Sequence, residues 1–133
     1  MMKTSPIDLF HSAIRLYDNG RVQAEERQMH GELNGWTVAT FHVETDEDVH
    51  PDYWEMHPGA EEAVCVLAGG VRIFLRPEGP GSEEATTLKA GNVFIVPRGR
   101  WHRLELDGPS DLMSITLRNG TRLEKRAEGQ SGA

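Results

Sequence analysis

Hydrophobic and polar positions along this chain alternate over short segments and do not keep the 3.6-residue spacing of a long amphipathic helix. The segments are rich in Val, Ile, Thr and aromatic residues, and Gly, Pro, Asn and Asp separate them, which is typical of strands joined by turns. The pattern therefore predicts a mostly β protein. The segments expected to form strands are 12–17, 21–26, 36–43, 53–57, 62–68, 71–76, 86–88, 93–96, 101–106 and 112–117.

The first two segments are expected to form an opening hairpin. Asp18-Asn19-Gly20 lies between them, and an Asn-Gly pair supplies the positive φ that tight hairpin turns need. A short helix over residues 7–15 is the alternative. Small antiparallel barrels have exposed edge strands, and the apolar strand 12–17 could pair across a two-fold axis to cover one of them, so we expect a homodimer.

Alternation within segment 53–57 places two candidate ligands together. Side chains of a strand point to opposite faces in turn, so Trp54 and Met56 share one face while Glu55 and His57 share the other. A carboxylate and an imidazole are therefore expected to point the same way.

The same reasoning applies to segment 101–106. His102 falls on the same face as Leu104 and Leu106, so it is expected to point inward with them. By alternation Glu62 should also point inward, and its neighbour Glu61 is interpreted as a surface carboxylate. His42 can line the cavity, but its interpretation as a satisfied or exposed histidine is favoured.

Length and composition limit the classes of protein to consider. With 133 residues the chain fits one domain, expected over residues 1–125 with a core at about 36–118 and a flexible polar tail at 126–133. No apolar run approaches the roughly 20 residues of a membrane helix, and the N-terminus lacks the apolar stretch of a secretory signal. A cytoplasmic protein without a membrane partner is expected.

Charge and cysteine content exclude further classes. The net charge is −7, so the chain lacks the basic character of a protein that binds nucleic acid. Cys65 is the only cysteine, which excludes an internal disulfide and a thiolate cluster. Its apolar surroundings favour a small buried side chain.

Histidines and glutamates on strands far apart in sequence can meet inside a barrel and form a site for one metal ion. Such a site needs three or more donors at about 2.0–2.3 Å from the metal. Imidazole and carboxylate donors suit Zn, Fe, Mn, Ni or Cu without choosing among them.

These residues resemble the two sequence motifs of the cupin superfamily. The second motif, G-x5-P-x-G-x2-H-x3-N, is matched by residues 91–102 through His102, and it departs only at its final Asn, where Leu106 stands. The first motif is G-x5-H-x-H-x3,4-E-x6-G. Its second histidine, its glutamate and its closing glycine match His57, Glu62 and Gly69.

Two positions of the first motif depart from the family pattern. Glu55 stands in place of the first histidine, and Val49 in place of the opening glycine. The resemblance implies a small single-domain cupin with an all-β, jelly-roll-like barrel, also called a double-stranded β-helix. It also implies that His57, Glu62 and His102 occupy metal-ligand positions.

The role of Glu55 stays open at this point. The carboxylate is either a fourth ligand to a divalent transition metal or a catalytic general base beside it. Alternatively, Glu55 pairs with a neighbouring Arg or His and no metal binds.

Two functions follow as the main hypotheses. The first is a metal-dependent enzyme of oxygenase, isomerase or hydrolytic type that acts on a small organic substrate. The second is a non-catalytic module that binds a small ligand or a metal. A protein that works only through its surface is a third and weaker hypothesis, because one fold hosts many activities.

Overall fold

The computed structural model describes residues 5–27 and 35–127, and almost all regular structure in them is β. The elements are β1 (Ser12–Leu16), β2 (Val22–Glu26), β3 (Trp36–Val43), the 3₁₀ helix η1 (Asp46–Val49), β4 (Tyr53–Met56), β5 (Glu62–Ala68), β6 (Gly70–Leu75), β7 (Glu84–Lys89), β8 (Val93–Val96), β9 (His102–Leu106), β10 (Ser110–Leu117) and β11 (Arg122–Lys125). Within the described ranges no helix has the length and apolar character that crossing a membrane requires.

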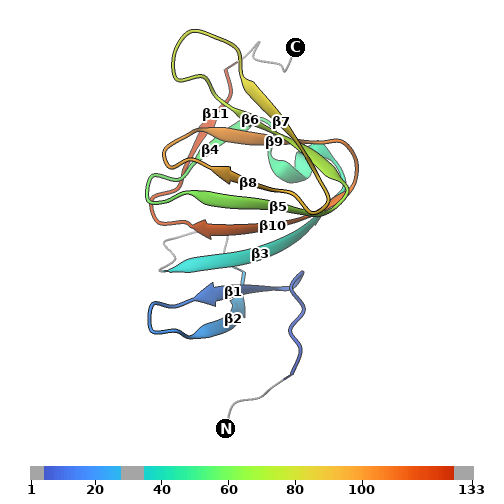
Figure 1. Ribbon diagram of the computed structural model, residues 1–133, viewed down its shortest axis with the longest axis vertical. Coiled ribbons are helices and arrows are strands. Elements are labelled where there is room, and N and C mark those ends of the chain that lie inside the picture. The colour runs from blue at the N-terminus through green and yellow to red at the C-terminus, as the bar shows by residue number, and fades with distance from the viewer. Residues whose placement is uncertain (1–4, 28–34, 128–133) are drawn as a thin grey trace.

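The strands form two antiparallel sheets (Figure 1). One sheet has the order β2-β1-β3-β10-β5-β8 and the other the order β11-β4-β9-β6-β7. The apolar core lies between them and includes Val64 and Val66 of β5 and Val71, Ile73 and Leu75 of β6. The predicted all-β, jelly-roll-like fold of cupins is therefore confirmed.

Strand β5 shows how the alternation in sequence becomes two faces. Glu62, Val64 and Val66 are buried, whereas Cys65 is half-buried and Leu67 is exposed on the opposite face. The expectation of a fully buried Cys65 is wrong, because its side chain points away from the core. The carboxylate of Glu62 is thus carried inward by the same periodicity that buries the valines.

The predicted N-terminal hairpin is confirmed, and the alternative helix over residues 7–15 is absent. Gly20 adopts a φ of 88° in the turn, which only glycine adopts without strain. Strand β1 pairs with β2 on one side and with β3 on the other, so the hairpin extends the larger sheet (Figure 1). Both edges of β1 are therefore paired within the chain, and the homodimer stays a prediction.

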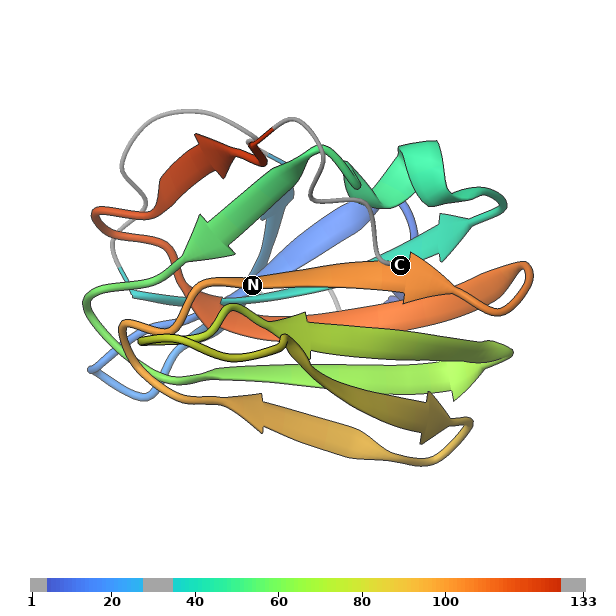
Figure 2. The ribbon, with the colours of Figure 1, turned by 90° about the horizontal axis from the view of Figure 1, so that it is seen from above.

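Strand β11 was not predicted from the sequence. Its four residues are all exposed and carry no apolar alternation, which removes the signal that strand prediction depends on. The strand pairs with β4 over its whole length, and Figure 2 shows the two side by side. Of the expected tail, residues 128–133 lie outside the described residues.

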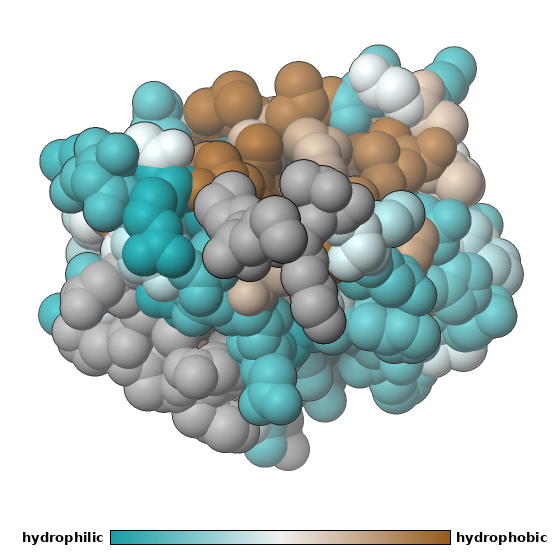
Figure 3. Space-filling model, turned by 90° about the horizontal axis from the view of Figure 1, so that it is seen from below, coloured by the Kyte–Doolittle hydropathy of each residue, from teal (hydrophilic) through white to brown (hydrophobic). Residues whose placement is uncertain are grey.

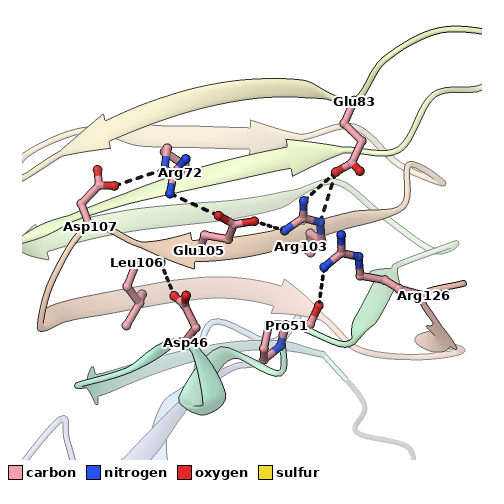
Figure 4. Close-up of polar contacts among 9 residues, drawn as sticks. All are labelled: Asp46, Pro51, Arg72, Glu83, Arg103, Glu105, Leu106, Asp107 and Arg126. Atoms are coloured by element: carbon pink, nitrogen blue, oxygen red, sulfur yellow. Dashed lines mark hydrogen bonds and ion pairs between the residues drawn. The ribbon is translucent and has the colours of Figure 1, made fainter. Parts of the chain in front are cut away.

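The outer face of the smaller sheet carries a network of charged residues (Figure 4). Arg103 lies in its middle, only 3% exposed, with its guanidinium bonded to Glu83 and Glu105. The same guanidinium lies 4.0 Å from the ring centre of Phe74 and 5.4 Å from that of Trp54. Trp54 can therefore be buried although it points away from the core, which leaves the inner face of β4 to Glu55.

Candidate metal centre

Four side chains converge at one place between the two sheets. Glu55 comes from β4, His57 directly follows β4, and His102 begins β9, where it lies opposite Glu55 in the β4–β9 register. Glu62 reaches the same place from β5 in the other sheet. Each residue contributes one possible ligand atom, and all four atoms lie within 4.8 Å of one another.

The two imidazoles direct the same nitrogen at both carboxylates. Nε2 of His57 lies 3.2 Å from Oε1 of Glu62 and 3.3 Å from Oε1 of Glu55. Nε2 of His102 lies 3.1 Å and 3.7 Å from the same two oxygens. The four atoms therefore surround a common point, as the ligands of a mononuclear metal do.

Partners on the far side of each ring fix its orientation. Nδ1 of His102 lies 3.2 Å from the carbonyl oxygen of Arg100, which can only accept, so this nitrogen carries the proton. Nδ1 of His57 lies 2.8 Å from the hydroxyl of Thr121. With Nδ1 bonded, Nε2 of each ring is the nitrogen presented to the centre, which is the arrangement that metal-binding histidines require.

One carboxylate is oriented in the same manner. The hydroxyl of Thr116 donates to Oε2 of Glu62 over 2.7 Å, which leaves Oε1 directed at the two imidazoles. The buried Nε2 of His57 has no hydrogen-bond partner of good geometry among the described residues. A buried nitrogen of this kind costs stability unless something binds it, and a metal ion would do so.

The pKa values of the four groups reflect their mutual contacts. Burial by itself would raise the pKa of Glu62, but His102 and His57 lower it to about 2, and they hold the pKa of Glu55 well below its usual range. Burial would lower the pKa of each histidine, but Glu55 and Glu62 raise the pKa values of His57 and His102 to about 9.

These shifts describe a site that balances its own charge. With both histidines protonated and both glutamates ionised, the metal-free cluster carries no net charge. A divalent cation that replaces the two protons leaves this balance unchanged. The donor set therefore fits a divalent metal in both chemistry and charge.

Glu55 differs from the other three residues in its surroundings. Its side chain is 30% exposed, whereas those of His57 and Glu62 are 3% and 6% exposed. Its second oxygen, Oε2, lies 3.7 Å from Nη2 of Arg118. Glu55 thus stands on the open side of the cluster, where an incoming molecule would meet it.

Glu61 and His42 do not join the cluster, as the sequence analysis favoured. Glu61 is exposed, and His42 faces away from the cluster and contacts Asp111 over 2.7 Å. Sequence reasoning missed Thr116, Thr121 and Arg118, which support the four residues. Thr116 had a usable signal, because it alternates in phase with the buried Leu112 of β10, whereas Thr121 follows the last predicted strand.

Comparison with known proteins identifies the family. Residues 39–117, more than half of the chain, match the family model of the cupin domain. The chain therefore belongs to the cupin domain family. A search of curated proteins finds no match.

Solved structures agree on the fold. A cupin-2 domain protein from Shewanella frigidimarina NCIMB 400 is 21% identical over 72% of this chain and 76% of its own, with a TM-score of 0.47. Oxalate decarboxylase from Bacillus subtilis, which has Mn(II) centres, is 21% identical over 68% of this chain, with a TM-score of 0.50. Peruvianin-I, a cysteine peptidase from Thevetia peruviana latex, is 16% identical over 70% of this chain and 58% of its own, with a TM-score of 0.53.

This chain spans only 23% of the length of the oxalate decarboxylase. At these identities the likeness shows the shared fold alone.

Proposed function

We propose that this protein binds one divalent transition metal, Zn, Fe, Mn, Ni or Cu, through His57, Glu62, His102 and Glu55. The observation that carries the proposal is the convergence of four ligand atoms within 4.8 Å of one another, among them the buried Nε2 of His57, which has no hydrogen bond of good geometry among the described residues. Two imidazoles and two carboxylates suit each of these metals. The Mn(II) centres of the Bacillus subtilis oxalate decarboxylase support Mn as one candidate.

The further proposal is a metal-dependent enzyme that acts on a small organic substrate. A bound metal supplies Lewis acidity or activates water or oxygen, which suits an oxygenase, isomerase or hydrolytic enzyme. His57, Glu62 and His102 hold their positions because each is buried and bonded on its far side. Glu55 is the candidate catalytic base, because it is the most exposed of the four and can accept a proton from a molecule at the open side.

A second candidate function is a binding module without turnover. The observation that favours it is the same tight grouping, in which Glu55 lies 3.3 Å from His57 and 3.7 Å from His102 and can complete a four-ligand set. Four protein ligands fill the tetrahedral coordination that Zn prefers in structural sites, whereas an octahedral metal such as Mn keeps two positions open. The two functions therefore differ in whether the bound metal keeps a coordination position for a substrate.

Elemental analysis of protein purified without a metal-affinity tag tests the metal site. We expect close to one metal per chain in the wild type, and its loss in His57→Ala and in His102→Ala. His42→Ala is the matched control, because His42 also contacts two carboxylates but lies outside the cluster. A wild type that is metal-free and cannot be loaded would overturn the proposal.

We also propose that the protein forms a homodimer through the outer face of the larger sheet. Val93 and Ile95 of β8, Leu67 of β5 and Val22 of β2 are 47–67% exposed on this face. Figure 3 shows apolar side chains gathered on one side of the molecule. An apolar patch can cover the same patch of a second copy, so two chains can bury it across a two-fold axis.

Light scattering coupled to size-exclusion chromatography tests the dimer. We expect twice the chain mass for the wild type at micromolar concentration, and the monomer mass for Ile95→Glu. Glu61→Gln changes an exposed polar residue that is not one of these apolar side chains, so this control variant should stay dimeric. A monomeric wild type would contradict the dimer and leave the metal site untouched.

A further inference from the structure

A cavity lies beside the metal centre, on the inner side of β1, β3 and β10 and at the end of β2. Two of its lining residues touch the centre directly. Thr116 donates to Glu62 over 2.7 Å, and Arg118 approaches Glu55 at 3.7 Å. Thr116 and Arg118 therefore connect the cavity to two of the candidate metal ligands.

The cavity is lined by three arginines, Arg15, Arg27 and Arg118, and by one carboxylate, Glu26. Nε of Arg15 pairs with Oε2 of Glu25 over 2.9 Å. Glu25 and Glu26 together offset two of the three positive charges. Since the metal centre balances its own charge, the cavity keeps a net charge of +1.

The excess charge is held in place by groups that do not neutralise it. The guanidinium of Arg27 donates to the backbone carbonyl oxygens of Leu9 and Thr40 and stacks 4.7 Å from the ring centre of Phe41. Among the described residues, no carboxylate pairs with Arg27. Its position is therefore fixed while its charge remains available to a ligand.

The hydroxyl of Thr37 provides a second and independent indication of a polar ligand. Thr37 lines the cavity, is only 8% exposed, and its Oγ1 has no hydrogen-bond partner among the described residues. A buried hydroxyl without a partner destabilises the fold, because the group has lost its hydrogen bonds to water. A ligand that hydrogen-bonds to Thr37 would remove this destabilisation.

The size of the cavity limits the ligand. The space in which the centre of a water molecule can lie has a volume of about 60 Å³. One water needs roughly 10–15 Å³ on the same measure, so the space is that of a few waters. The space therefore suits a molecule, or the end of a molecule, of a few carbon atoms.

We propose that this cavity binds a small organic monocarboxylate, held by Arg118 and Arg27 and by the Thr37 hydroxyl, with its other end facing the metal centre. The single excess positive charge favours a monoanion, and an arginine fork matches the two oxygens of a carboxylate. Thr37 and the three arginines lie outside residues 39–117, so the assignment concerns this chain and not the family pattern. The inference rests on the proposed function, because it names the ligand class of the same site.

Acetate and acetamide make a direct test, because they have nearly the same shape and differ in charge. We would titrate each into the full-length protein by ligand-observed NMR at constant ionic strength, once with the metal removed and once with it loaded. We expect saturable binding of acetate at both metal states and at least tenfold weaker binding of acetamide. Equal binding of the two would overturn the inference. Binding of inorganic phosphate as tight as that of acetate would also overturn the inference.

Two variants locate the binding. Arg118→Gln and Arg27→Gln should each weaken acetate binding at least tenfold. Arg21→Gln, which removes the same charge from the same hairpin but outside the cavity, should not. Arg27 touches none of the four metal ligands, so its variant remains decisive even if Arg118→Gln disturbs the centre. Acetate affinity unchanged in Arg27→Gln overturns the assignment.

Metal content measured on the same samples separates this inference from the proposed function. A metal-loaded wild type that does not distinguish acetate from acetamide refutes only the carboxylate site. A wild type that binds no metal, yet binds acetate in a manner that depends on Arg27, supports the carboxylate site and refutes the metal centre.

Discussion

Thr121 acts on the candidate metal centre without being a ligand. Its hydroxyl lies 2.8 Å from Nδ1 of His57 and holds the ring with Nε2 toward the other donors. Loss of such a supporting bond typically lowers metal affinity by about 10–100-fold. We therefore expect weaker metal binding in Thr121→Val, with Thr121→Ser close to the wild type, measured by competition with a chromophoric chelator. Equal affinity in Thr121→Val and the wild type would refute the role of this hydroxyl.

Glu55 can be tested at the position where the family motif has histidine. If Glu55 ligates the metal, Glu55→Gln should bind metal about tenfold or more weakly, because the amide lacks the charge, while Glu55→His should retain stoichiometric metal. Metal content and chelator competition measure both. Undiminished affinity in Glu55→Gln would show that Glu55 is not a ligand and leave it the role of base.

Some of the residues of the site could be predicted from the sequence and others could not. Alternation in β4 and β9 placed Glu55, His57 and His102 on the correct faces, because strand periodicity is local. Thr121 and Arg118 could not be found in that way, because their role depends on long-range contacts between separate strands.

The outer face of the smaller sheet supports the strand that carries Glu55. Arg103 is buried between Phe74 and Trp54, and its loss removes the ion pair of Glu83 and one of the two ion pairs of Glu105. We expect Arg103→Ala to lower the free energy of unfolding by about 3–5 kcal/mol, measured by urea denaturation.

The matched control is Arg72→Ala on the same face. The side chain of Arg72 is 42% exposed and pairs with Glu105 and Asp107, so its loss should cost about 1 kcal/mol or less. Similar losses in the two variants would contradict the view that burial, and not the number of ion pairs, sets the importance of Arg103.

Ten of the described strands follow segments that the sequence predicts, within a few residues. These segments combine β-branched residues with turn residues at their ends, which is a strong local signal. The four residues of β11 are all exposed and lack that signal, and the strand forms by pairing with β4. The 3₁₀ turn η1 was not predicted either, because its acidic residues are all outside the core and give no apolar periodicity.

The metal-free molecule should depend on pH through its two clustered histidines. The pKa values of His57 and His102 are raised to about 9 in the folded state from about 6.5 in the unfolded chain. A raised pKa stabilises the folded state fully below pH 6.5, and this contribution is lost as pH rises through 9. We expect the free energy of unfolding of the metal-free protein to fall between pH 6.5 and 9, by more than about 2 kcal/mol.

Denaturation with guanidinium chloride, in the presence of a chelator, measures this dependence. The double variant His57→Gln/His102→Gln is the control and should show a much flatter profile. A wild-type profile equally flat over the same range would contradict the charge balance described for the cluster.

The cupin fold of the molecule could be predicted from the sequence, because the second motif is matched from residue 91 to His102. The cavity could not, since Arg15, Arg27 and Arg118 come from three separate segments that meet only in the folded sheet. The boundaries of the domain at 1–125 stay a prediction.

The two histidines of the centre are oriented by different kinds of support, and this matters for how the protein can evolve. His102 relies on the backbone oxygen of residue 100, which every amino acid provides, so no single substitution there removes it. His57 relies on a side chain, that of Thr121. A single substitution at residue 121 can therefore change the metal affinity while every ligand stays the same. Homologues that differ at this position should differ in metal affinity.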